Sequence, residues 1–178
     1  MTVSPDMLRL GDRDQPSRPD FELPVVLVLD HLRSAYNTGN IFRLAEATRA
    51  RAICPTGYTP APPHEKLAKT ARGCDVLVPV RPFATAAEAL SALKREGYTL
   101  YAVETVEGAR TPWETDFRFP AALVLGNEAL GISPEALALC DECVALPALG
   151  CKNSINVGNA AAVVLFQALR QYQSNSAP

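Results

Sequence analysis

Long hydrophobic runs, a strong excess of charge and a secretory leader are all missing from this sequence. No apolar stretch approaches the roughly 18 residues that a helix needs to cross a bilayer. The first twenty residues mix both charges with proline and lack the apolar centre of a secretory signal. With 17 basic and 19 acidic side chains, the net charge is −2. We therefore expect a soluble cytoplasmic protein without a membrane partner.

The near-neutral charge also limits how the chain can bind nucleic acid. A domain that coats itself with nucleic acid usually has a strong net positive charge. Any such contact here must come from local basic clusters, which on charge alone are equally well explained as solvated surface. Three clusters are present: Arg9, Arg13 and Arg18; Arg33, Arg43, Arg49 and Arg51; and Lys66, Lys69 and Arg72.

Histidine and cysteine are too few, or too widely spaced, for the commonest sites that they build. The five cysteines are an odd number in a chain without an export signal, which argues against a disulfide framework. Cys140 and Cys143 form a C-x-x-C pair, but a zinc site needs a second pair or two suitably spaced histidines. His31 and His64 are the only histidines and are far apart in the sequence. We expect structural cysteines and no metal.

The familiar catalytic and phosphate-binding motifs are absent as well. The sequence contains no G-x-G-x-x-G after its first predicted strand and no G-x-x-x-x-G-K-[ST]. It also lacks H-E-x-x-H and G-x-S-x-G. Neither histidine stands beside an obvious nucleophile, so Ser-His or Cys-His hydrolysis is poorly supported.

What the sequence does have is an alternation of short apolar runs and amphipathic stretches, with 48% hydrophobic residues. Alternating strands and helices indicate an α/β fold with a mostly parallel sheet and helices on both faces. We expect one domain over residues 21–173, a mobile arm over 1–20 and a disordered tail over 174–178. The predicted strands are 25–30, 51–54, 76–80, 98–103, 121–125 and 144–146, and the predicted helices are 40–50, 65–71, 84–96, one beginning at 133–135, and 155–173.

Glycine and polar side chains gather where three of these strands end. They occupy residues 37–43 after the first strand, 126–133 after the 121–125 strand, and 147–156 after the last strand. Ligands of open α/β sheets lie outside the carboxyl ends of the strands. Glycines allow close approach to the backbone, and helix starts offer free N–H groups. Any one loop is explained as well by turns and helix caps, but three together predict a shared site.

The three segments carry a resemblance to a known family. In order and spacing they are similar to the three motifs of the SpoU-type RNA 2′-O-ribose methyltransferases of the SPOUT superfamily, and the similarity spans residues 24–173. The motifs are Asn37-x-Gly39-x-x-x-Arg43-Leu44-Ala45, then Leu125-Gly126-Asn127-Glu128-x-x-Gly131-Ile132-Ser133, then Leu146-Pro147-x-x-Gly150-x-x-x-Ser154-Ile155-Asn156-Val157.

The resemblance implies a C-terminal trefoil knot, S-adenosylmethionine bound there in a bent form, and a homodimer with active sites at its interface. It implies catalytic roles for Asn37, Arg43, Glu128, Ser154 and Asn156. One departure is that Val157 is followed by Gly158-Asn159, where the family often continues its third motif as Asn-Val-Ser. The expected methyl-donor pocket is formed by Gly126, Leu146, Ser154 and Ile155, with Glu104 and Thr105 from the end of the 98–103 strand.

The family proposal makes the arginine of the first motif the base, but chemistry favours another role for Arg43. Arginine keeps its proton, with a pKa above about 12, and is therefore a poor acceptor. A phosphate clamp that also stabilises the developing alkoxide suits a guanidinium better. Glu128 either accepts the proton or anchors Asn37 or a helix start, and we slightly favour the anchor. The reaction requires no metal.

The sequence leaves alternatives open for the substrate RNA and for the class of protein. We expect a tRNA ribose as the substrate, with ribosomal RNA second. A non-catalytic RNA-binding member of the family is a further possibility, although Arg43, Glu128 and Asn156 are all retained. The last alternative is an α/β enzyme that uses another nucleotide cofactor, and the missing phosphate-binding loops argue against it.

Overall fold

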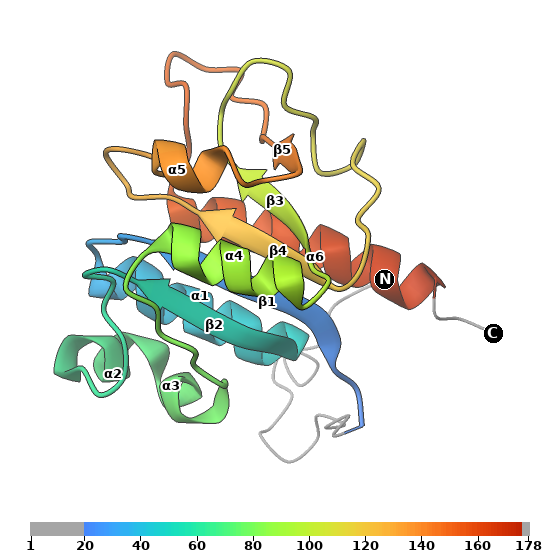
Figure 1. Ribbon diagram of the computed structural model, residues 1–178. Helices are drawn as coiled ribbons and strands as arrows, with labels where there is room; N and C mark the ends of the chain where they lie inside the picture. Colours follow the sequence, from blue (N-terminus) through green and yellow to red (C-terminus); the bar gives the residue numbers. More distant parts are fainter. Residues whose placement is uncertain (1–19, 176–178) are drawn as a thin grey trace, which may run out of the picture.

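The computed structural model describes residues 20–175, which fold around one five-stranded sheet (Figure 1). All strand pairs are parallel, in the order β2-β1-β4-β3-β5. The strands are β1 (Leu23–Asp30), β2 (Ala50–Thr56), β3 (Thr99–Val103), β4 (Ala121–Leu125) and β5 (Glu142–Val144). The helices are α1 (Ala35–Thr48), α2 (Glu65–Ala71), α3 (Cys74–Leu77), α4 (Ala86–Arg95), α5 (Pro134–Leu137) and α6 (Val157–Asn175).

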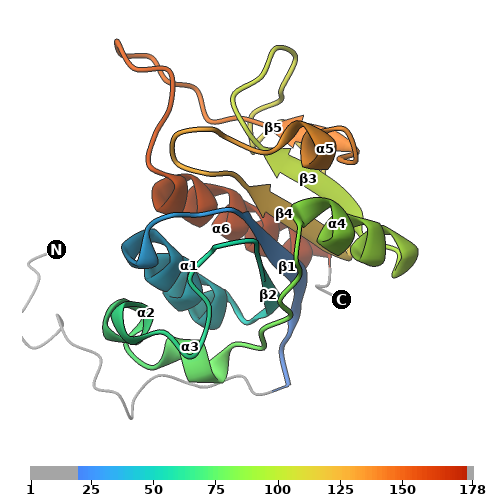
Figure 2. The ribbon, with the colours of Figure 1, turned by 60° about the vertical axis from the view of Figure 1, so that its left-hand side comes forward.

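Helices cover both faces of the sheet, as predicted, because successive side chains of a strand point to opposite sides. Leu27 and Leu29 of β1 join the core beneath α1, α2 and α6. Val26 and Val28 of the same strand join the core beneath α4 and α5. Figure 2 shows α1 and α2 on the opposite side of the sheet from α4. The continuous apolar run of β1 therefore reflects burial on both faces, and every residue of this strand is buried.

The strand predicted over residues 76–80 is wrong. Residues Cys74–Leu77 form the short helix α3, in which Val76 is 80% and Leu77 68% exposed. The chain then follows the outer edge of β2 through isolated bridges from Val80 to Ile53 and from Phe83 to Thr56. Prolines at 79 and 82 have no N–H to donate, so this segment cannot form a regular ladder.

Two helix starts differ from the prediction in ways that matter for the site. α1 begins at Ala35 rather than near Asn40, because Ser34 caps it by accepting a hydrogen bond from the backbone N–H of Asn37. The first polar segment therefore lies inside a helix and not in a loop. α6 begins at Val157 rather than Ile155 and extends to Asn175.

The described part of the chain begins at Asp20 and ends at Asn175. Residues 1–19 of the expected arm and 176–178 of the expected tail lie outside the described residues, whereas Ser174 and Asn175 belong to α6. β5 occupies Glu142–Val144, two residues earlier than predicted. The trefoil knot stays a prediction. Among the described residues, no helix combines the length and apolar character that a membrane span requires.

Candidate methyl-transfer site

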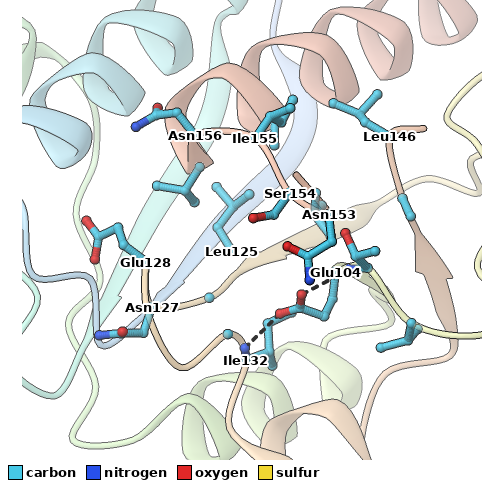
Figure 3. A pocket seen from close by; sticks show the side chains of 18 of the residues that line it. Glu104, Leu125, Asn127, Glu128, Ile132, Leu146, Asn153, Ser154, Ile155 and Asn156 are labelled. Carbon is cyan, nitrogen blue, oxygen red and sulfur yellow. Dashed lines mark hydrogen bonds between the residues drawn. The ribbon is translucent and has the colours of Figure 1, made fainter. Parts of the chain in front are cut away.

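A cavity of about 750 Å³ opens at the carboxyl ends of β3, β4 and β5 (Figure 3). It brings together residues that the sequence analysis assigned to the donor pocket or to catalysis and that lie far apart along the chain. These are Glu104, Thr105, Gly126, Glu128, Leu146, Ser154, Ile155 and Asn156. The remaining lining residues are mostly apolar and include Val103, Leu125, Ile132, Val144 and Val157. The rule that ligands bind where parallel strands end therefore located the cavity correctly.

A chain of three polar side chains ties the three sequence motifs together at the rim of this cavity. The Asn37 Nδ2 group donates a hydrogen bond to Glu128 Oε1 at 2.9 Å. Asn156 Nδ2 donates to Asn37 Oδ1 at 3.0 Å. Asn37 is 8% exposed, so its amide is held firmly between the other two side chains. Residues separated by 91 and 119 positions in the sequence thus form one connected unit.

Glu128 is engaged by the start of α1 as well as by Asn37. Its carboxylate accepts hydrogen bonds from the backbone N–H of Arg33 at 2.9 Å and of Ser34 at 3.1 Å. Partial burial raises its pKa, but the hydrogen bonds from Arg33, Asn37 and Ser34 together outweigh burial and lower the pKa below its usual value. A carboxylate with this environment stays ionised and anchors the helix start.

Asn156 serves as the cap of α6 in addition to binding Asn37. Its Oδ1 atom accepts hydrogen bonds from the backbone N–H groups of Gly158 at 2.9 Å and Asn159 at 3.3 Å. A Cβ at Gly158 would press on the side-chain amide of Asn40 in α1. The departure from the family pattern at residues 158–159 therefore leaves a normal helix start and allows α1 and α6 to approach closely.

The Glu104 side chain, at the end of β3, is hydrogen-bonded to the loop that follows β4. One carboxylate oxygen accepts a hydrogen bond from the Ile132 N–H and the other from the Thr105 N–H, both at 3.0 Å (Figure 3). Gly131 adopts a φ of +72°, and a Cβ there would press on the Glu104 carboxylate. A Cβ at Gly126 would overlap the backbone of Gly131 and Ile132. Both glycines are thus explained by the tight packing of this loop.

Arg43 is the one predicted site residue that the fold does not bring to this cluster. It lies on α1, is exposed and does not line the cavity. Its side chain has no hydrogen bond or ion pair with any other residue in the range 20–175. Its guanidinium is therefore available to an outside group such as a phosphate.

A model of the SpoU rRNA Methylase family matches residues 24–166, and therefore includes all three motifs and the cavity. The chain belongs to this family. The resemblance noted from the motifs is thus confirmed.

Similar proteins include both tRNA-modifying enzymes and structures with the methyl donor. The tRNA (guanosine(18)-2′-O)-methyltransferase of Thermus thermophilus is 37% identical over 150 residues, which cover 83% of this chain and 75% of that protein. The SpoU methyltransferase AviRb of Streptomyces viridochromogenes, solved in complex with AdoMet, has a TM-score of 0.77 at 26% identity and covers 98% of this chain and 74% of AviRb. A structure described as giving insight into 2-OH methylation of C/U34 on tRNA has a TM-score of 0.76 at 26% identity. The match covers 84% of this chain and 97% of that one.

The sequence analysis did not predict the roles of two residues that hold the loops around this cavity. Asn127 holds its own loop: its Oδ1 atom accepts from the Ala129 and Leu130 N–H groups, and its Nδ2 group donates to the His31 carbonyl. Asp30 is 1% exposed and accepts hydrogen bonds from both the backbone N–H and the hydroxyl of Ser133 at 2.7 Å. The available signal was an acidic residue ending a buried strand, where an apolar side chain would otherwise be expected.

Gly39 has a different role from the one expected for it. Instead of admitting a ligand, it allows α2 to pack against α1, because a Cβ at this position would overlap the Thr70 side chain. The Thr70 hydroxyl donates a hydrogen bond to the Ala35 carbonyl at 2.9 Å across the same contact. The first motif of this SpoU-family chain therefore combines a packing glycine with the site residue Asn37.

Metal ligation and cysteine chemistry find little support within residues 20–175. No group of three or more His, Cys, Asp or Glu side chains in this range is placed to hold a metal ion. The cysteines of the C-x-x-C pair are free thiols, and burial raises the pKa of Cys140 to about 12. Both sulfur atoms pack at the edge of the core beneath α4 and α5, consistent with a structural role.

Proposed function

We propose that this protein transfers a methyl group from S-adenosylmethionine to a ribose 2′-hydroxyl of tRNA. The observation that carries the proposal is the meeting of all three motifs at one cavity through Glu128, Asn37 and Asn156. The Thermus relative, named as a tRNA 2′-O-methyltransferase, supports the same reaction for this chain. The AdoMet complex of AviRb supports the same donor. Ribosomal RNA is the second candidate substrate, because the family description names it.

The cavity fits the proposed donor in size and in chemistry. Its volume of about 750 Å³ lies within the usual range for ligand pockets, which is about 300–1,000 Å³. Apolar side chains such as Leu125, Leu146 and Ile155 suit an adenine ring, and neighbouring backbone groups suit its ring-edge nitrogens. Each Glu104 oxygen accepts one backbone hydrogen bond and retains a lone pair for a sugar hydroxyl. Bound S-adenosylmethionine supplies the electrophilic methyl group.

The protein's own contribution is to position and stabilise charge. Glu128 already receives three hydrogen bonds and has a lowered pKa, which makes it a weak base at neutral pH. We therefore assign to it the anchoring of the α1 start and of Asn37. Asn37 and Asn156 hold the rim of the cavity in one geometry, and such positioning can supply much of a reaction barrier. A guanidinium carries a positive charge and five N–H donors, so we assign to Arg43 the RNA phosphate and the charge that develops on the ribose oxygen.

We also propose a homodimer, because Arg43 lies outside the cavity and an apolar helix face lies uncovered. Val163 is 43% and Phe166 47% exposed on α6, the helix that packs against α1. Exposed apolar side chains on one helix are typical of a protein interface. Sedimentation equilibrium at micromolar concentration should give the mass of two chains, and a mass of one chain would contradict the proposal. A tRNA substrate also supports the cytoplasmic location expected from the sequence.

Replacing Arg43 tests the proposed function most sharply. The purified protein is incubated with labelled S-adenosylmethionine and with tRNA or ribosomal RNA from a strain lacking the gene. We expect Arg43→Ala to lower methylation by roughly 100-fold or more, because it removes charge stabilisation in the transition state. Calorimetry should show S-adenosylmethionine binding nearly unchanged, since Arg43 does not line the cavity.

The matched control is Arg95→Ala, which removes an exposed arginine from α4 on the opposite face of the sheet. Its activity should equal that of the unaltered protein. Normal turnover of Arg43→Ala would refute the role given to Arg43. Binding of FAD or NAD in place of S-adenosylmethionine would refute the proposed donor, and donor binding without methylation of either RNA would point to a non-catalytic RNA-binding protein.

A further inference from the structure

Tyr58 is a large aromatic side chain that is held in place beside the cavity and yet left open to solvent. It follows β2 and is 58% exposed. Its hydroxyl accepts a hydrogen bond from Asn127 Nδ2 at 2.9 Å. Its ring meets the His31 imidazole edge to face, with 5.0 Å between the ring centres and 66° between the planes. Because the Tyr58 ring is held in place but largely exposed, packing in the core does not explain its position.

The surroundings of His31 fix this ring pair further. The His31 Nδ1 atom lies 2.6 Å from the buried carboxylate of Asp30. His31 adopts a φ of +54°, a conformation that is sterically unfavourable for a residue with a side chain. A Cβ at Gly57 would overlap the imidazole, so the turn before Tyr58 must be glycine for the histidine to pack there. His31 therefore contacts Tyr58 from a strained backbone conformation, which the surrounding contacts hold in place.

The ring pair is joined directly to the methyl-transfer site. Asn127, which binds both the Tyr58 hydroxyl and the His31 carbonyl, lines the donor cavity. Arg33 lies two residues after His31, and its backbone N–H donates to Glu128. The Arg33 guanidinium is exposed and has no hydrogen bond or ion pair with another residue between 20 and 175. An open aromatic ring and an available cation thus flank the Glu128 end of the cavity.

From this arrangement we propose that an unpaired nucleobase of the RNA substrate stacks on Tyr58 while Arg33 contacts an adjacent phosphate. The inference rests on the proposed function, since an RNA substrate is its premise. Proteins recognise single-stranded RNA by stacking splayed bases on aromatic side chains, and arginine binds phosphate oxygens through its N–H groups. Neither contact requires a particular base, so this surface holds RNA near the donor and leaves base specificity to other contacts.

Two substitutions at Tyr58 separate stacking from the support of Asn127. Tyr58→Ala removes the ring and the hydroxyl, whereas Tyr58→Phe keeps the ring and loses only the hydrogen bond. With bulk tRNA from a strain lacking the gene, we expect Tyr58→Ala to raise the apparent KM for RNA roughly tenfold and Tyr58→Phe to change it by less than about twofold. Calorimetry should give the same affinity for S-adenosylmethionine in both variants and in the unaltered protein.

The control is Val76→Ala, which alters an even more exposed side chain on α3, next to the groove at the starts of β1 and β2. An unchanged KM for RNA in Tyr58→Ala would overturn the inference while leaving the proposed function intact. Weaker donor binding in both Tyr58 variants would also overturn it, because Tyr58 would then act by supporting Asn127. If the unaltered protein methylates neither bulk tRNA nor bulk ribosomal RNA, the proposed function fails and this inference fails with it.

Discussion

Five acidic side chains at the two ends of the sheet have different kinds of partner. At the carboxyl ends of the strands, Asp30, Glu104 and Glu128 each accept backbone N–H groups from a neighbouring loop. At the opposite end, Glu22 and Glu142 form exposed ion pairs with arginines, at 2.7 and 2.8 Å. The hydrogen bonds to backbone N–H groups fix the path of the loops. The exposed ion pairs join side chains on strands whose positions the sheet already determines. Exposed ion pairs of this kind contribute little to stability.

The difference explains how a functional site can be built from distant parts of the chain. The hydrogen bonds of Asp30 and Glu128 span 103 and 95 residues, respectively. Asp30 holds Ser133 at the start of α5, and Glu128 holds Ser34 at the start of α1. Each carboxylate therefore fixes the start of a helix from a distant part of the chain. A buried or partly buried acceptor with several donors is costly to lose, because the donors are left unsatisfied. Asp30 and Glu128 should therefore matter more for folding than Glu22 and Glu142.

The largest expected effect is that of Asp30→Ala. This carboxylate accepts hydrogen bonds from the Ser133 N–H, the Ser133 hydroxyl and His31, and it is 1% exposed. Its removal leaves the partly buried donors of Ser133 and His31 without this acceptor, so we expect the free energy of unfolding to fall by about 3 kcal/mol. Urea denaturation followed by circular dichroism measures this change.

The variant Asp30→Asn serves as the control, because its amide oxygen still accepts from Ser133. It should lose less stability than Asp30→Ala. A loss below about 1 kcal/mol in Asp30→Ala would contradict the view that buried hydrogen bonds at this end determine the fold of the loops.

A smaller effect is expected for Glu128→Gln. The amide keeps one acceptor oxygen but places an NH2 donor against the N–H group of either Arg33 or Ser34, and the favourable charge at the start of α1 disappears. We expect the free energy of unfolding to fall by about 1 kcal/mol at neutral pH. Because the pKa of Glu128 is lowered in the folded protein, its contribution is present above its unfolded value and is lost as the pH falls through the lower folded value.

The same substitution at Glu22 gives the matched comparison and the smallest effect. Glu22 pairs with Arg51 in an exposed ion pair, so Glu22→Gln should change the free energy of unfolding by less than about 0.5 kcal/mol. Denaturation of both variants between neutral pH and pH 3 should show the stability gap between Glu128→Gln and the unaltered protein closing at the acid end. If both variants lose the same free energy of unfolding at neutral pH, the proposed difference between Glu128 and Glu22 is wrong.

The sequence predicted the elements that depend on local patterns. Apolar runs located the buried strands, and the rule for parallel sheets indicated the cavity that residues 126–132 and 153–156 line, although residues 147–152 do not line it. The order of the three motifs indicated the family, which the family model confirms. Periodicity failed at Val76, because a short exposed helix and a buried strand can share the same few apolar residues.

The finer parts of the site depend on contacts that no local pattern encodes. The position of Asn37 inside α1 follows from the Ser34 cap and from Glu128, which lies 91 residues away. Asp30 ends a strand in the sequence, and only the fold places Ser133 against it. Arg43 shares a motif with Asn37, but only Asn37 is hydrogen-bonded to residues that line the cavity, and Arg43 does not line it. This contrast is the reason for proposing a second copy.

Mapping ribose methylation in total RNA tests the central claim most directly. Cells lacking the gene are supplied either with the unaltered chain or with Arg43→Ala, and every 2′-O-methylated position is compared between the two. We expect at least one tRNA ribose that is methylated with the unaltered chain and unmethylated with the variant. Identical methylation maps for both strains would contradict it.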